Sequence, residues 1–187
     1  MKFVTGAGLA ALMASAVFAP ANAQLARKST APIAFDYRSG GYDPETCIYS
    51  LLGGGSFTQE TSQLRSQVVR RIDARKADGS CGELLRIEAE GSVFYITPES
   101  SLSSDTAARP ASGAPAPQLR IRADKAVYTA ADDLIVFTGE PVTMASERGV
   151  SESRRITVQV STGRALMDSG DEGRVQGVFR PPPKKAP

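Results

Sequence analysis

Histidine and tryptophan are absent from the 187 residues, and only two cysteines are present. The missing imidazole excludes histidine-based acid–base catalysis and histidine-ligated metal. No Gly-x-Ser-x-Gly elbow occurs either, so no nucleophile and base are assembled in the sequence. We therefore expect a protein that is not an enzyme and that holds no metal or cofactor. A hydrolase built on a Ser–Lys or carboxylate pair is the alternative.

A strong excess of charge of either sign is also lacking. The formal net charge is +2, and removal of the segment that contains Lys2 would leave +1, since Lys2 is its single charge. No basic stripe with interleaved aromatic residues follows. Nucleic acid is therefore not expected as a partner.

Long apolar runs are confined to the N-terminus. Lys2 precedes an apolar stretch from Phe3 to Phe18, and Ala21-Asn22-Ala23 closes it with small residues. This order is typical of a signal peptide, so we expect residues 1–23 to be removed after Ala23. The alternative is a retained N-terminal anchor. The mature chain is expected to work outside the cytoplasm.

Cys47 and Cys81 are the two cysteines. In an exported chain, two thiols without histidine nearby are most simply a disulfide, and two free thiols are the alternative. Such a bridge would stabilise the fold by roughly 3 to 4 kcal/mol.

Period-two alternation dominates the rest of the chain. Leu119, Ile121 and Ala123 alternate with charged residues, and the segment from Ile156 to Val160 repeats the pattern. Turn-forming residues recur between such runs, so we predict an all-β domain over 24–180, with a proline-rich loop at 110–117 and a disordered tail at 181–187. The segment 59–75 fits either a helix or a strand, and its β-branched pair Val68-Val69 favours the strand.

Glycine recurs between apolar strand halves in a weak internal repeat. The three copies are centred on 53–55, Gly91 and Gly139. Glycine inside a strand permits a bulge or a sharp bend, which a rolled sheet needs at its corners. Chance similarity among β-rich segments is the alternative.

The stretch 119–181 resembles the LptA/OstA family of periplasmic lipopolysaccharide transport proteins. The resemblance rests on Ala123-Asp124-Lys125-Ala126-x-Tyr128, Phe137-Thr138-Gly139, the strand Arg155 to Val160 with Thr162-Gly163, and Gly173-Arg174-Val175 leading to Phe179-Arg180-Pro181. The first half matches more loosely, through Pro32-Ile33-x-Phe35-Asp36. The cysteine pair and the proline-rich loop depart from the family pattern.

This resemblance implies a β-jellyroll of twisted antiparallel sheets with a V-shaped cross-section and an apolar groove. It implies a periplasmic bridge that binds lipopolysaccharide, contacts LptC-like and LptD-like proteins and stacks head to tail with itself. The alternative is a disulfide-bonded β-sandwich that binds another protein and transports no lipid.

Strand alternation also predicts which side chains line the groove. Core packing is the alternative for each of them. Arg120, Arg122 and Lys125 could meet lipid phosphates, although alternating charges are usually a solvated face. The predicted groove residues are Ile33, Phe35, Phe57, Phe94, Ile96, Tyr128, Val136, Val142, Met144, Ile156 and Val158.

Overall fold

The computed structural model describes residues 32–98, 118–160, 164–169 and 174–179. The predicted signal peptide at 1–23, the loop at 110–117 and the tail at 181–187 lie outside these ranges. Within the described ranges, no helix has the length and apolar character needed to cross a membrane.

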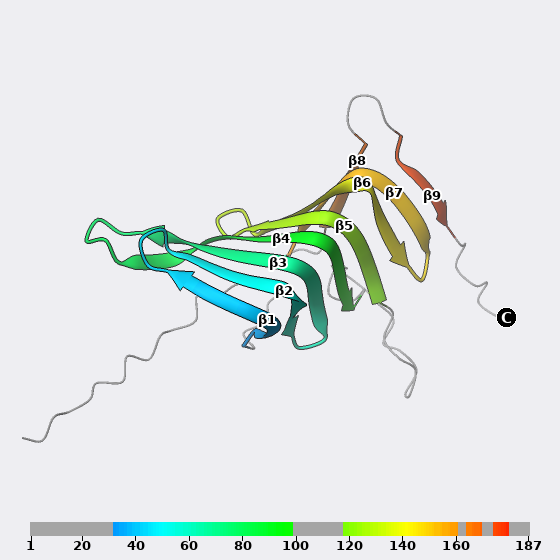
Figure 1. Ribbon diagram of the computed structural model, residues 1–187. Helices are drawn as coiled ribbons and strands as arrows, with labels where there is room; N and C mark the ends of the chain where they lie inside the picture. Colours follow the sequence, from blue (N-terminus) through cyan, green and yellow to red (C-terminus); the bar gives the residue numbers. More distant parts are fainter. Residues whose placement is uncertain (1–31, 99–117, 161–163, 170–173, 180–187) are drawn as a thin grey trace, which may run out of the picture.

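The described residues form one antiparallel sheet of nine strands (Figure 1). From β1 to β8, each strand pairs with the strands that precede and follow it in the chain. The last strand, β9, pairs with β7 on the same side as β8 but along a different part of that strand. The all-β prediction is confirmed, and the ambiguous segment 59–75 contains strand rather than helix. The strands are β1 Ala34–Asp43, β2 Ile48–Gln59, β3 Ser62–Arg75, β4 Cys81–Pro98, β5 Gln118–Thr129, β6 Leu134–Ser146, β7 Gly149–Gln159, β8 Arg164–Asp168 and β9 Gln176–Phe179.

A line of register shifts crosses the sheet and coincides with a sharp bend. Every ladder from β1–β2 to β6–β7 skips residues near the middle of its strands. Figure 1 shows β3 to β7 turning at this position. Gly53, Gly54 and Gly91 lie on the line with φ between +78° and +84°, a conformation that glycine adopts without a steric penalty. The glycine repeat therefore does mark the corner predicted from the sequence.

The bend divides the sheet into two limbs. The disulfide limb comprises residues 39–43, 48–52, 68–75, 81–90, 125–129, 134–138 and 155–159 together with β8. The β9 limb comprises residues 34–37, 55–59, 62–66, 93–98, 118–123, 142–146 and 149–153 together with β9. In β1, β3, β5, β6 and β7 the extra residues at the bend reset the alternation, whereas β2 and β4 keep it, so the apolar side chains of both limbs face the inside.

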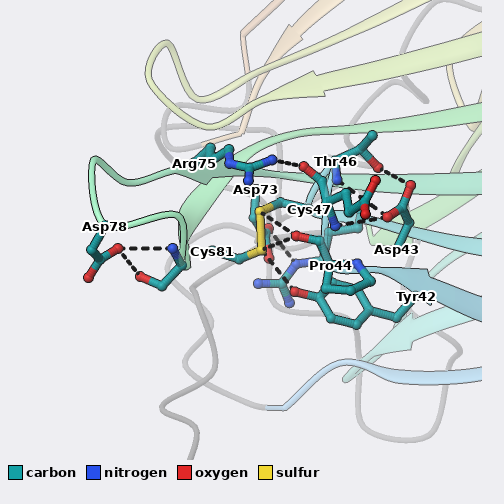
Figure 2. Close-up of a disulfide and its surroundings, with 12 residues drawn as sticks. Tyr42, Asp43, Pro44, Thr46, Cys47, Asp73, Arg75, Asp78 and Cys81 are labelled. Atoms are coloured by element: carbon teal, nitrogen blue, oxygen red, sulfur yellow. Dashed lines mark hydrogen bonds and ion pairs between the residues drawn. A yellow bond between two sulfur atoms is a disulfide. The ribbon is translucent and has the colours of Figure 1, made fainter.

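The free end of the disulfide limb is closed by the predicted covalent bridge. Cys47 in the β1–β2 turn and Cys81 at the start of β4 form a disulfide with Cα atoms 5.5 Å apart. Figure 2 shows how the turn folds around it, with Asp43 accepting a hydrogen bond from the Thr46 hydroxyl at 2.7 Å. Arg75 donates a hydrogen bond to the Glu45 carbonyl. The disulfide prediction is confirmed, and the bridge ties the first hairpin to the centre of the sheet.

Candidate functional site

The inner face of the bent sheet is the candidate site, because apolar side chains face inward from every strand between β1 and β8. The strand register places Phe35, Phe57, Leu64, Tyr95, Ile121 and Met144 in one row across the β9 limb. A second row crosses the disulfide limb through Ile87, Tyr128, Ile135, Val158 and Ala165. The first row begins at the β1 edge of the sheet, and the second reaches β8 on the opposite side.

Eight of the predicted groove residues lie on or beside this inner face. Tyr128, Val142, Ile156 and Val158 are buried, whereas Ile33, Phe57 and Met144 are half-buried and packed against the core. Phe35 is 62% exposed although it belongs to the same row as Phe57.

The predicted inward orientation of Phe94, Ile96 and Val136 is wrong. Phe94 pairs with Arg65 and Arg122, which are both exposed on the outer face. The register then places Ile96 on that same outer face. Val136 pairs with Val127 and Thr157, while its neighbours Ile135 and Phe137 are buried. In β6 the extra residues at the bend reverse the alternation, so counting by two across Gly139 gives the wrong side. In β4 the alternation continues across Gly91, but the run from Val93 to Ile96 is apolar at every position and so does not indicate which residues face inward.

The inside of the bend is filled in the centre of the sheet by the protein's own aromatic rings. Tyr95 from the β9 limb and Phe137 from the disulfide limb lie with ring centroids 5.6 Å apart. Both rings are almost completely buried. The paired Ala89 and Ala126 next to Phe137 are small enough to leave room for its ring. The two limbs are therefore packed against each other here, as the core-packing alternative predicts.

Tyr95 also carries the polar group that lies deepest in this packing. Burial raises the pKa of the Tyr95 hydroxyl to about 12, and hydrogen bonds with Thr97 and Ser62 oppose the rise. The hydroxyls of Ser62 and Thr97 are 2.8 Å apart and fully buried. Because burial outweighs these hydrogen bonds, the pKa of the phenol lies above its ordinary value of 10 and the group is neutral at physiological pH.

The inner face opens toward solvent at the β1 side of the β9 limb. The Phe57 ring lies 6.0 Å from Phe35 and 5.5 Å from Tyr37, measured between centroids. The Tyr37 hydroxyl is 3.0 Å from the Ser66 hydroxyl, and burial raises the Tyr37 pKa. Ile33, two residues before Phe35, packs against the same buried core as Tyr37 and Phe57. We call Ile33, Phe35, Tyr37 and Phe57 the aromatic mouth, an apolar surface that the rest of the described chain leaves partly uncovered.

A more polar group closes the same side of the disulfide limb. Tyr42 stacks on Tyr49 with centroids 4.2 Å apart, and the Arg71 guanidinium lies 5.7 Å from the Tyr49 centroid. Arg71 pairs with the buried Asp73 at 2.8 Å. This end of the inner face is therefore amphipathic, whereas the aromatic mouth is mainly apolar.

Several inner-face residues are not among the predicted set. Tyr37, Tyr95 and Phe137 line the bend or the mouth, and Met167 pairs with Ile156 at the far side. Tyr95 is identified by its pairing with Leu64 and Ile121 in the neighbouring strands. The sequence alone does not give that register.

Comparison with known proteins supports the fold and nothing finer. No family model and no curated protein matches the chain. Among solved structures, the chain is similar to LptH, the LptA homologous periplasmic component of the lipopolysaccharide transport device from Pseudomonas aeruginosa. The TM-score is 0.61 at 13% sequence identity, over 81% of this chain and 96% of LptH. The chain has the LptA-like β-jellyroll fold. The expected fold class is thus confirmed.

Proposed function

We propose that this protein is a non-enzymatic, periplasmic component of lipopolysaccharide transport that holds acyl chains against its inner face. The observation that carries the proposal is the aromatic mouth, where an LptA-like sheet leaves Phe35 62% exposed beside Phe57 on its inner side. Each CH₂ group buried there contributes about 0.8 kcal/mol. A shallow contact of this kind is favourable, yet it is weak enough for a lipid to move on.

The disulfide supports the proposed compartment. A bridge between Cys47 and Cys81 persists in an oxidising environment such as the periplasm. The N-terminal segment 1–23, expected to be a signal peptide, would direct the chain there.

The proposed path begins at the aromatic mouth and continues along the inner face. Farther in, an acyl chain meets the packed pair Tyr95 and Phe137, so the two limbs must separate to admit it. Movement from one membrane to the other would use energy supplied elsewhere, with this chain as a bridge between LptC-like and LptD-like proteins. The open strand edges of β1 and of β8 with β9 would contact these partners or further copies of the chain.

A photo-crosslinking amino acid placed at Phe35 or Phe57 tests this proposal. In cells, both positions should capture lipopolysaccharide, because both face the proposed path. Leu52 is the matched control, since it is 44% exposed on the opposite face of β2. Equal capture at Leu52, or no lipid at Phe35 and Phe57, would exclude the lipid path.

The filled bend also favours a second function, namely a protein-binding module without lipid transport. In that case the same crosslinker at Phe35 captures a polypeptide and no lipid. Replacement of Phe35 by alanine would then abolish partner binding while leaving lipopolysaccharide transport in the host unchanged.

A further inference from the structure

Three arginines on the outer face of the β9 limb lack the carboxylate partners that other arginines of the sheet have. Arg65 Nε donates to the Gln63 side chain at 2.9 Å, and Arg120 donates to the Gln118 side chain at 3.3 Å. The Arg122 guanidinium lies 5.7 Å from the centroid of the Phe94 ring. Among the described residues, none of the three forms an ion pair.

The outer face of the disulfide limb is different. Arg70 and Lys125 both pair with Glu90, at 3.1 and 2.9 Å, and Arg86 pairs with Glu88 at 2.7 Å. The hydrogen bonds from Lys125 and Arg70 lower the Glu90 pKa, which keeps that carboxylate charged. Lys125 and Arg70 therefore share one carboxylate partner, whereas Arg120 and Arg122 have none among the described residues.

The strand register places the three arginines next to an exposed apolar row. Arg65, Phe94 and Arg122 are direct neighbours across β3, β4 and β5. The next row on this face, two residues beyond Phe94 toward the strand ends, contains Val150 and Val178, which are 46% and 74% exposed. They belong to a row made up of Ile96, Arg120, Ala145, Val150 and Val178.

Acidic residues flank this surface rather than cover it. Asp36 lies two strands from Arg65, and Glu152 lies two strands from Arg122, in the same row. Two strand spacings correspond to about 10 Å, which is close to the screening length at physiological salt. The centre of the surface is therefore positive.

We infer that this arginine face, defined by Arg65, Phe94, Ile96, Arg120, Arg122, Ala145, Val150 and Val178, docks on an anionic membrane surface. A guanidinium presents a planar fork of donors that matches the oxygens of a phosphate group. Exposed valines beside arginines suit the boundary between headgroups and acyl chains, where an apolar row is buried and the charges stay at the phosphates. A purely acidic surface would pair with the arginines but would not bury the valines, whereas an anionic membrane does both. The inference does not depend on lipid binding at the inner face.

Vesicle co-sedimentation of the purified protein tests the arginine face. Vesicles of phosphatidylcholine with phosphatidylglycerol should bind the protein, and vesicles of phosphatidylcholine alone should bind it far less. The double variant Arg120→Gln/Arg122→Gln should lose about fivefold in partition coefficient for each arginine removed. Raising the salt to about 1 M, where the screening length is about 3 Å, should release the protein.

The matched control is Arg70→Gln/Arg86→Gln, which removes the same charge from arginines that already have carboxylate partners. It should bind anionic vesicles like the unchanged protein, with folding of both variants checked by thermal melting. Phe35→Ala should also leave vesicle binding unchanged, which separates this surface from the proposed lipid path.

Three results would overturn the inference. The first is that the protein does not bind anionic vesicles, and the second is that both double variants lose vesicle binding to the same extent. The third is arginine-dependent binding to polyglutamate without binding to vesicles. The last result would assign the face to an acidic protein.

Discussion

Tyr95 combines two roles at the inside of the bend. Its ring packs on Phe137 across the limbs, and its hydroxyl belongs to a buried hydrogen-bonded group with Ser62 and Thr97. Buried polar groups are tolerated only when they are satisfied, so this small network fixes how the two limbs meet. The contribution of this group to the stability of the fold can be measured through the ionisation of the Tyr95 phenol.

We expect the protein to lose stability above about pH 10 through Tyr95. The folded pKa is about 12, above the ordinary value of 10. Below pH 10 both states keep the proton; between pH 10 and 12 only the unfolded state releases it, so unfolding becomes easier as pH rises. The loss amounts to roughly 3 kcal/mol. Denaturant titrations across this window should show a smaller loss for Tyr95→Phe, and identical curves would contradict the assignment.

Single residues also show where the alternation of apolar and charged residues predicts the side of the sheet on which a side chain lies, and where it does not. Leu119, Ile121 and Ala123 are buried as predicted, because charged residues separate them and the apolar set is unambiguous. The run from Val93 to Ile96 is apolar at each of its four positions, so no period can choose between Phe94 and Tyr95. Only pairing with Leu64 and Ile121 selects Tyr95 for the inside.

Among the elements, the bend depends on positions that accept only glycine. A Cβ added at Gly91 would lie 2.8 Å from the Cβ of Gln67, and the residue has φ +78°. We expect Gly91→Ala to destabilise the fold by about 1 to 3 kcal/mol, because a side chain is strained in this conformation and meets a neighbour. Equilibrium unfolding in denaturant measures the change.

Gly41 in β1 provides the matched control. A Cβ there would have no heavy atom within 4 Å. Gly41→Ala should change the free energy of unfolding by less than about 0.5 kcal/mol. Equal destabilisation by both substitutions would mean that the bend does not require glycine.

The hairpin β1–β2 depends on the disulfide more than on packing, because most of β1 is exposed. The bridge joins cysteines 34 residues apart. Closing such a loop stabilises the folded state by about 4 kcal/mol in the chain-entropy model. Cys47→Ser/Cys81→Ser should therefore shift the denaturation midpoint downward. Reductant should produce the same shift in the unchanged protein and none in the double variant; insensitivity of both proteins would show that the bridge contributes nothing.

At the scale of the whole molecule, the sequence predicted the bend but not how closely the limbs pack. The glycine repeat marks the corner, and the alternation marks an apolar side on each limb. Whether those sides enclose a groove depends on the distance between limbs, which Tyr95 and Phe137 set by contact. Contact between residues so far apart in sequence leaves no local pattern. Lipid binding by the predicted groove residues stays a prediction.

The two sides of the sheet are unequal, and this decides how copies of the chain could join. One side is the single strand β1, with ten residues, whereas β8 and β9 share the other side along different parts of β7. An unpaired strand is a template for another strand, so β1 of one copy can extend the sheet of the next. Such stacking would continue the apolar inner face from copy to copy, as the proposed bridge requires.

If stacking uses the β9 side, a charge at Val178 should weaken it. Val178 is 74% exposed, so Val178→Lys should leave the melting temperature unchanged while lowering the concentration-dependent mass measured by light scattering. Leu85→Lys is the matched control, because Leu85 is 51% exposed on β4, which is paired on both sides. Reduced self-association in Val178→Lys alone would place the contact at the β9 edge. Equal association of both variants and the unchanged protein would exclude stacking through that edge.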